Sequence, residues 1–319
     1  MGPLDSALAE VEQFLTQLTT SGEASGAVSA VASTQLETLL SAVWSRIPAG
    51  GFPRGGEAQR AFRGRLGPLF WQSPLIRRCD EKPRGYAGDF EMMGAIYEGS
   101  ARGETPLGRW LDAWVLEQPG FVAVRNRRAQ LTTLLAAEHE RGARRIADVA
   151  CGAATELVDH VRARSPSSIL LLDQDQGALS AAMIGLSGAL GSAREQTRLT
   201  PWHGSVLALL RPKDKEELPA ASQDVVYSIG LYDYLSERLA AALTQRLWRA
   251  LGPQGLLCIG NFNGQNPMRH LIEAAMDWYL VYRDPPALLQ LAAQLPGVER
   301  AEVVTEPTGC LHLLLARKR

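Results

Sequence analysis

Apolar residues recur every three or four positions through most of the first 140 residues, which is the spacing of helices that bury one face. In the first stretch these positions are Leu4, Leu8, Val11, Phe14, Leu15 and Leu18. Further helices are predicted near 35–47, 57–69, 107–116 and 121–141, with Ser-, Gly- and Pro-rich connections at 21–33 and 48–56. The N-terminal part of the chain is therefore predicted to be helical.

After Gly142 the pattern changes to short apolar runs that alternate with helical stretches. Strands are predicted at 146–150, 169–173, 196–200, 224–229, 256–260, 301–305 and 310–316, and helices at 154–164, 177–190, 237–251, 267–279 and 286–295. Such alternation predicts a mostly parallel α/β sheet with helices on both faces. Because no full helix separates the last two strands, they are expected to form an antiparallel edge hairpin.

The strand at 146–150 leads into a helix through a run of small residues, Cys151-Gly152-Ala153-Ala154. Small side chains let the backbone approach a bound group, and the first amides of the helix point towards it. Asp173 ends the next strand about twenty residues beyond the turn, where an acidic side chain can accept hydrogen bonds from a ribose. Only one glycine of a dinucleotide fingerprint is present, so an ordinary strand-to-helix turn is the alternative.

The segment 79–93 interrupts the helical pattern and collects polar and aromatic side chains. Pro83, Gly85 and Gly88 break any helix here. Polar groups on a glycine-punctuated loop suit a lid over a ligand, and a structural connector with a solvated charge cluster is the alternative.

Composition limits the classes of function. With 33 basic and 34 acidic residues among 319, the chain lacks the charge footprint of a nucleic-acid-binding protein. Cys79, Cys151, Cys258 and Cys310 are widely spaced, so neither a metal site nor a disulfide framework is expected. No membrane-spanning run or signal peptide is recognised. We expect a cytoplasmic monomer or homodimer with buried thiols, a small-molecule substrate, and no nucleic-acid or membrane partner.

The α/β part, roughly residues 143–319, resembles the class I S-adenosylmethionine (SAM) dependent methyltransferases. The similarity is carried by the turn at 148–152, Asp173, Gly204-Ser205-Val206 and the strand at 224–227. A more specific similarity is to bacterial enzymes of 3-hydroxypalmitic acid methyl ester biosynthesis, and these in turn are similar to methyltransferase-like enzymes that cyclise SAM to azetidine-2-carboxylate. The segments of this chain that carry the more specific similarity are 82–89, 150–152, 227–235, 260–262 and 277–278.

This resemblance implies a Rossmann-like SAM-binding catalytic domain at 143–319 and a helical lid domain at 1–142. Asp173 would bind the ribose hydroxyls, and Gln174 would lie against the adenine. The remaining cofactor residues implied are Ala150, Cys151, Gly152 and Ala153 at the amino-acid tail, Ser205 and Val206 at the adenine amino group, and Ser228, Ile229 and Gly230 at the sulfonium. Ser205 stands where many relatives have an aspartate.

Aromatic faces attract a desolvated cation by roughly 0.5–2 kcal/mol each, and several tyrosines are predicted near the sulfonium. A hydroxyl or amine acceptor needs a general base, which a carboxylate does not, and His203, Asp233 and Tyr232 are the candidate bases. The catalytic candidates are Tyr86, Tyr227, Tyr232 and Asp233, and the substrate or lid candidates are Arg84, Asp89, Asn261, Trp278 and Tyr282.

The leading hypothesis is methyl transfer to a carboxylate, hydroxyl or amine of a small molecule in secondary or signalling metabolism. One alternative is a cyclase that converts SAM itself into azetidine-2-carboxylate and methylthioadenosine. The other is a SAM-binding regulator without catalysis.

Overall fold

The computed structural model describes residues 2–211 and 217–319. The chain folds into two compact units, which are described separately. Unit 1 comprises Met1–Val124 and Pro267–Tyr279, and unit 2 comprises Arg125–Asn266 and Leu280–Arg319. This division falls within helix α7 (Pro119–Glu140), before the boundary that the sequence predicts at Gly142, and it assigns a short C-terminal segment to unit 1.

Unit 1 is helical. It contains α1 (Pro3–Thr20), the short η1 (Glu23–Ser25), α2 (Ala30–Trp44), α3 (Glu57–Phe70), α4 (Pro74–Glu81), α5 (Phe90–Glu98), α6 (Pro106–Leu116), the start of α7, and α12 (Arg269–Ala275). The predicted apolar stripe of α1 is buried from Leu8 to Leu18, which confirms that helix. The sequence interpretation missed α4 and α5, although Ser73 and Asp89 cap their first turns by accepting from backbone amides.

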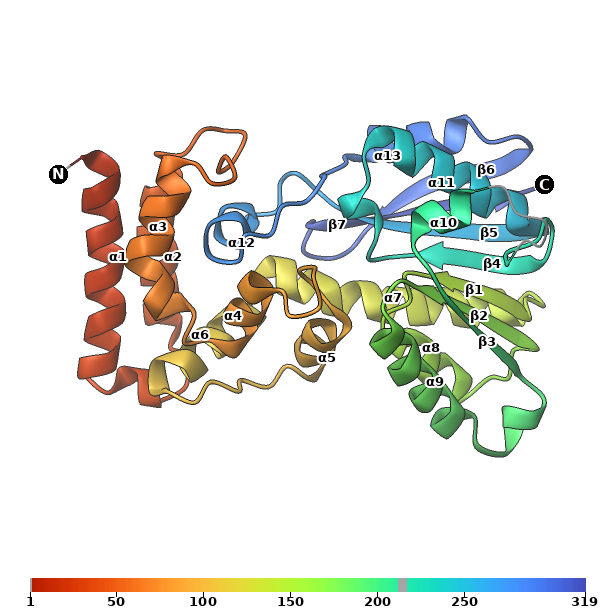
Figure 1. Ribbon diagram of the computed structural model, residues 1–319, viewed down its shortest axis with the longest axis horizontal. Coiled ribbons are helices and arrows are strands. Elements are labelled where there is room, and N and C mark those ends of the chain that lie inside the picture. Colours follow the sequence, from red (N-terminus) through yellow and green to blue (C-terminus); the bar gives the residue numbers. More distant parts are fainter. Residues whose placement is uncertain (1, 212–216) are drawn as a thin grey trace. The chain divides into compact units, whose positions relative to one another are not determined.

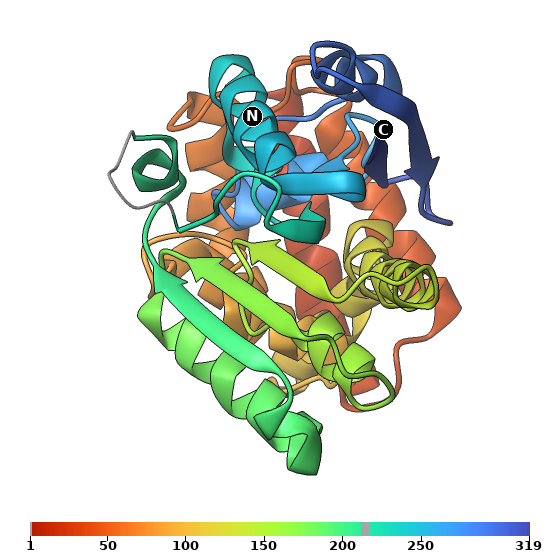
Figure 2. The ribbon, with the colours of Figure 1, turned by 90° about the vertical axis from the view of Figure 1, so that its right-hand side faces the viewer.

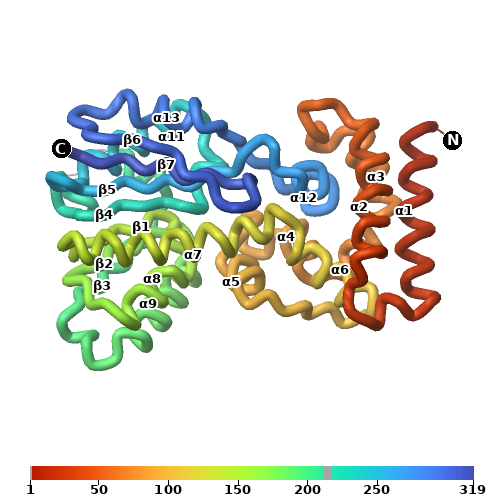
Figure 3. The backbone as a smooth tube through the Cα atoms, turned by 180° about the vertical axis from the view of Figure 1, so that it is seen from behind, coloured from red at the N-terminus to blue at the C-terminus, as the bar shows by residue number. Residues whose placement is uncertain are grey.

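Helix α12 is part of the packing of unit 1 although it follows the fifth strand in the chain. It lies beside α3 (Figure 3), and the His270 ring stacks on Trp44 with centroids 5.6 Å apart. The Glu273 carboxylate accepts from the Phe52 amide at 2.8 Å, and the Trp71 indole donates to the Ala275 carbonyl at 2.9 Å. The helix is shorter than the predicted 267–279 because Asp277 adopts a positive φ of 45° and ends it.

Unit 2 is built on a seven-stranded sheet of order β3-β2-β1-β4-β5-β7-β6 (Figure 1). The strands are β1 (Arg145–Val149), β2 (Ser168–Asp173), β3 (Arg198–His203), β4 (Gln223–Ser228), β5 (Leu251–Phe262), β6 (Val298–Thr305) and β7 (Leu311–Lys318). The first five run parallel, and β7 pairs antiparallel with both β5 and β6. The predicted fold class, including the antiparallel edge hairpin, is confirmed.

Helices cover both faces of this sheet. They are α8 (Thr155–Val161), α9 (Gln176–Leu190), α10 (Val206–Leu210), α11 (Glu237–Ala250) and α13 (Pro285–Ala293), with short turns η2 (Gly191–Glu195) and η3 (Tyr232–Tyr234). Figure 2 shows α9 lying along β2 and β3. Burial on both faces explains why β1, β2 and β4 read as nearly continuous apolar runs. Two predicted strands are corrected: β3 ends later, at His203, and β5 begins earlier, at Leu251.

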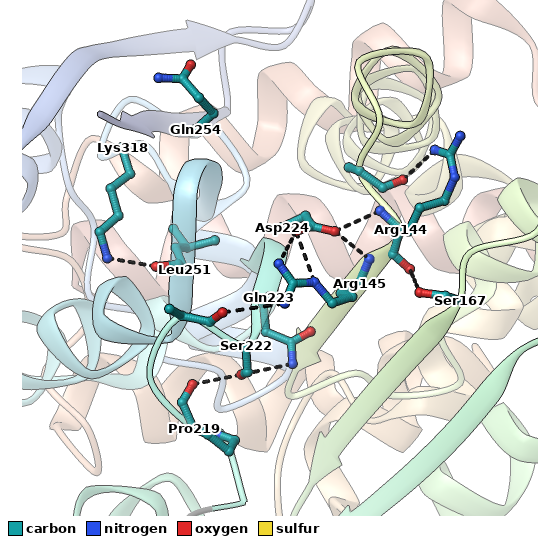
Figure 4. A network of polar contacts seen from close by, with 12 residues as sticks. Arg144, Arg145, Ser167, Pro219, Ser222, Gln223, Asp224, Leu251, Gln254 and Lys318 are labelled. Atoms are coloured by element: carbon teal, nitrogen blue, oxygen red, sulfur yellow. Dashed lines mark hydrogen bonds and ion pairs between the residues drawn. The ribbon is translucent and has the colours of Figure 1, made fainter.

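A polar network fixes the amino ends of β1 and β4 (Figure 4). The Asp224 carboxylate accepts from the amides of Arg144 and Arg145 at 2.8 and 2.9 Å, and from the Arg145 guanidinium at 2.5 Å. Burial raises the pKa of Asp224, but these hydrogen bonds outweigh burial and hold that pKa below its ordinary value. Asp224 therefore anchors β1 to β4 at the end of the strands opposite their carboxyl ends.

The packing of α12 leads to a prediction about the fragment 1–142. This fragment lacks the His270 stack, the hydrogen bond of Glu273 with Phe52 and the ion pair of Asp277 with Lys82, so we expect it to be weakly folded. Adding the peptide 267–279 in excess should raise its melting temperature by at least about 5 °C in circular dichroism. The control is the same peptide with Glu273→Ala and Asp277→Ala. Equal melting curves with and without the peptide would show that α12 does not stabilise this unit.

Candidate cofactor and active site

The turn between β1 and α8 holds an unusual backbone. Ala150, Gly152 and Ala154 have φ values of 60°, 54° and 48°, in a backbone region that residues other than glycine rarely adopt. The amides of Ala150 and Cys151 donate to the Leu172 carbonyl at 2.7 and 3.1 Å, which ties the turn to β2. Two alanines held in this region fit a site where the backbone conformation itself is functional.

Asp173, at the end of β2, organises the loops around this turn. Its Oδ2 accepts from the Gly152 amide and its Oδ1 from the Asp175 amide, both at 2.8 Å. The carboxyl is 7% exposed, and burial raises its pKa although the backbone amides oppose that shift. Asp175 in turn caps α9 by accepting from Gly177 at 2.8 Å. Asp173 therefore both shapes the turn and presents a buried acidic group beside it.

The carboxyl ends of β3 and β4 complete this region of unit 2. The Gly204 amide donates to the Asp173 carbonyl at 2.9 Å, and Ser205 caps α10, whose first residue is Val206. The Ser228 hydroxyl donates to the Val149 carbonyl at 2.7 Å and joins β4 to β1. Because strand order reverses between β1 and β4, this is the topological switch point where ligands of open α/β sheets bind.

The predicted cofactor residues of unit 2 thus follow the ends of four neighbouring strands. Gln174 is exposed, and its carbonyl lies 2.9 Å from His203 Nε2. The Ile229 carbonyl, just before Gly230, accepts from the buried Arg127 guanidinium at 2.7 Å. Arg127 lies on α7, so a helix far away in the sequence supplies a positive charge to this edge of the sheet.

A buried acidic cluster lies beside the same turn. The Tyr227 hydroxyl is 2.8 Å from Asp148 Oδ2 and 3.1 Å from Glu156 Oε1. All three side chains are buried, and Asp148 pairs directly with Tyr227 in the register of β1 and β4. Burial, and then the charge of Glu156, raise the pKa of Asp148 well above its ordinary value. The pKa of Tyr227 is raised well above its ordinary value by burial and by both acids.

A second buried carboxyl, Asp233, lies in the loop after β4. Its Oδ1 accepts from the Asn261 amide at 2.9 Å and from the Phe262 backbone at 2.6 Å. Arg283 donates to Asn261 Oδ1 at 2.7 Å, and because arginine only donates, the Asn261 nitrogen must face Asp233. Burial raises the pKa of Asp233 to about 6, against the lowering effect of the Phe262 amide, Arg127 and Arg283.

Tyr232 lies in the core of unit 2 rather than on an open surface. It is fully buried, and its hydroxyl is 3.0 Å from the Thr244 hydroxyl. Burial raises its pKa above the ordinary value, so Tyr232 is a poor proton acceptor near neutral pH. Tyr282, also in unit 2, is partly buried. Two of the tyrosines predicted around the sulfonium, Tyr227 and Tyr232, therefore have hydroxyls that are already hydrogen-bonded inside the protein.

The predicted lid segment, residues 82–89, and Trp278 belong to unit 1. Asp89 caps α5 by accepting from the Met92 amide at 2.9 Å, and it forms an ion pair with Arg78 at 2.9 Å. Arg84 lies 4.8 Å from the Phe90 ring centroid. Tyr86 is partly buried and Trp278 is buried.

Two of the motif segments meet inside unit 1. Lys82 Nζ lies 2.7 Å from Asp277 Oδ2, and both residues have positive φ values, 47° and 45°. Strain of roughly 1–3 kcal/mol per residue persists only where surrounding contacts impose it. The ion pair therefore holds the loop at 82–89 to the segment that follows α12.

Sequence reasoning assigned no role to four residues of these clusters, namely Arg127, Asp148, Glu156 and Arg283. Asp148 and Glu156 flank the predicted turn, but the β1–β4 register is needed to bring Asp148 to Tyr227, and the packing of α8 is needed to bring Glu156 there. Across the described ranges, 2–211 and 217–319, no group of three or more His, Cys, Asp or Glu side chains could hold a metal ion. In those ranges no helix is both long and apolar enough to cross a membrane.

The chain is similar to known proteins both in sequence pattern and in fold. A family model described as "Putative methyltransferase" matches residues 87–198. A solved structure of a "possible exported protein" from Bordetella parapertussis is similar over 98% of this chain and 96% of its own, with 18% identity and a TM-score of 0.60. No curated protein matches.

Two other solved structures are more distantly similar. The SAM-dependent methyltransferase SibL, in its apo form, has 16% identity and a TM-score of 0.48 over 98% of this chain and 96% of its own. Magnesium protoporphyrin IX methyltransferase from Synechocystis PCC 6803, with bound SAM, has 11% identity and a TM-score of 0.45 over 63% of this chain and 84% of its own.

The family match makes one segment of the chain similar to a putative methyltransferase, and the sheet of unit 2 has the predicted α/β fold. The matched residues, 87–198, include the turn after β1 and Asp173. The similarity to the exported protein concerns the fold alone, and the predicted cytoplasmic location stays a prediction.

Proposed function

We propose that this protein is a SAM-dependent methyltransferase that acts on a small molecule. The observation that carries the proposal is the turn at Ala150–Ala154, held in positive φ conformations and tied to the buried Asp173 at the topological switch point. The small side chains of such a turn let its backbone come close to the amino-acid tail of SAM. The free lone pairs of a buried carboxylate fit ribose hydroxyls.

Each strand end has a role in this proposal. Ala150, Cys151, Gly152 and Ala153 bind the tail through their backbone, and Asp173 binds the ribose. Gln174, Ser205 and Val206 border the adenine, and Ser228, Ile229 and Gly230 border the sulfonium. Because the Ser228 hydroxyl already donates to Val149, it offers the ligand its oxygen lone pairs and not its hydrogen.

Asp233 is the proposed general base for a hydroxyl or amine acceptor. Bound SAM supplies an activated methyl group, so the protein needs only to position the acceptor, exclude water and remove a proton. Asp233 takes the acceptor proton on the oxygen that does not bind Asn261 and Phe262, and later releases it to water. Asn261 and Arg283 are positioning residues, because Asn261 donates to the Asp233 carboxylate and Arg283 holds Asn261 in that orientation.

The segment 82–89 is the proposed lid, with Tyr86, Arg84 and Asp89 as its functional side chains and Trp278 and Tyr282 as further substrate contacts. The similarity to 3-hydroxypalmitic acid methyl ester biosynthesis makes a 3-hydroxy fatty acid the first acceptor to test. We propose a cytoplasmic enzyme, monomeric or homodimeric, with no nucleic-acid or membrane partner.

The nucleoside product separates the proposed reaction from the SAM cyclase and from a regulator. We expect SAM alone to be stable with the enzyme, and S-adenosylhomocysteine to form only when 3-hydroxypalmitate or an amine such as benzylamine is added. Mass spectrometry identifies the products and tells a methyl ester from a methyl ether. Methylthioadenosine formed from SAM alone above the spontaneous rate would instead identify a cyclase. Binding of SAM without any product would identify a regulator.

Asp233→Asn tests the general base. The variant keeps the shape and the Oδ1 acceptor, so SAM affinity should stay within about threefold, while kcat with a hydroxyl or amine acceptor falls by roughly 10²–10⁴-fold. Since the base must be deprotonated, kcat/KM of the wild type should rise with pH and level off above about 6. Asp284→Asn, a change in an exposed helix cap, is the control and should leave both quantities unchanged. An unchanged kcat in Asp233→Asn would remove Asp233 from the chemistry.

A further inference from the structure

Two carboxyl groups lie within hydrogen-bonding distance of the Tyr227 oxygen, and the phenol has only one hydrogen to donate. Its oxygen is within hydrogen-bonding distance of both Asp148 and Glu156, at 2.8 and 3.1 Å. A tyrosine hydroxyl has one hydrogen to donate, and an ionised carboxylate can only accept. Both contacts are full two-centre hydrogen bonds only if one of the two carboxyl groups is protonated and donates to the phenol oxygen, because otherwise one O–H is divided between two anions. The geometry therefore indicates a single proton shared by Asp148 and Glu156.

The surroundings favour keeping that proton. Asp148 is 1% exposed and Glu156 is 4% exposed, and two ionised carboxylates buried side by side would repel each other. The other groups that act on Asp148 are Tyr227 and the acidic Asp173. Burial raises the pKa of Glu156, and the positive charges of Arg127 and Arg128 lower it only in part. Ionised Glu156 beside protonated Asp148 is consistent with these charges.

The pair also flanks the segment proposed to bind the amino-acid tail of SAM. Asp148 lies two residues before Ala150, on β1, and Glu156 lies two residues after Ala154, on α8. The Cys151 thiol lies in the same acidic field, and its pKa is raised well above the ordinary value by burial and then by the three acids. A cation placed at this turn would stabilise the fully ionised pair.

We propose that Asp148 and Glu156 bind the ammonium group of the amino-acid tail and release their shared proton to solvent as that ammonium binds. The inference rests on the proposed function, because it takes SAM as the ligand of the turn. No bond other than the carboxyl O–H breaks, and the ligand ammonium replaces the proton as the positive charge of the pair. The affinity for SAM then increases with pH as long as the free protein holds the proton.

Calorimetric titration at pH 7 in two buffers of different ionisation enthalpy measures this release directly. S-adenosylhomocysteine, which keeps the tail, should release up to one proton per molecule bound. Methylthioadenosine, which lacks the tail, should bind without release. In Asp148→Asn the amide can donate to Tyr227 in place of the protonated acid, so the fold should be kept and the release lost. Glu156→Gln serves the same purpose if Asp148→Asn does not fold.

Each outcome decides the question. Binding of S-adenosylhomocysteine with the same enthalpy in both buffers, or equal release in wild type and Asp148→Asn, would overturn the shared proton while leaving the proposed cofactor site intact. Release with methylthioadenosine would show that the proton comes from elsewhere. If neither SAM nor S-adenosylhomocysteine binds, the proposed function fails, and this inference fails with it.

Discussion

The candidate site depends on the parallel pairing of β1 with β4. Its register places Asp148 beside Tyr227, and the Ser228 hydroxyl closes the same pair of strands against the Val149 carbonyl. Asp224 fixes the amino ends of both strands. Because a shift of one residue would turn every side chain to the other face of the sheet, this register decides which groups meet at the carboxyl ends. The contact of Asp148 with Tyr227 and the closure of β4 against Val149 follow from it.

Buried acids dominate the electrostatics of unit 2. Asp148, Glu156, Asp173 and Asp233 are all buried, and an isolated carboxylate in such surroundings is strongly unfavourable unless it is hydrogen-bonded, paired or protonated. Asp173 is stabilised by backbone amides, and Asp233 by Asn261 and the Phe262 amide. Asp148 and Glu156 instead share Tyr227. A cationic ligand at this edge would offset charge that the protein has only partly neutralised.

The fold was largely predictable from the sequence because β1, β2 and β4 are buried on both faces and read as apolar runs. The helices α4 and α5 were missed because both are short and border the glycine-punctuated loop. The start of β5 was missed because Gly252-Pro253-Gln254-Gly255 reads as a turn. The turn and Asp173 could be predicted from spacing alone, whereas the Tyr227 cluster requires cross-strand register. The place of Tyr232 after the fourth predicted strand made it an aromatic candidate but could not indicate that its hydroxyl points to Thr244.

The central claim is that the carboxyl ends of β1 and β2 bind SAM, and the affinity for S-adenosylhomocysteine tests it most directly. Two aspartates of the same sheet can be compared by calorimetry, one at each end of the strands. Asp173→Asn should weaken binding at least tenfold, because a carboxylate acceptor beside the turn is lost. Asp224→Asn, at the amino ends, should lower stability and leave the affinity of the folded protein unchanged. Equal affinities in wild type and folded Asp173→Asn would contradict the account.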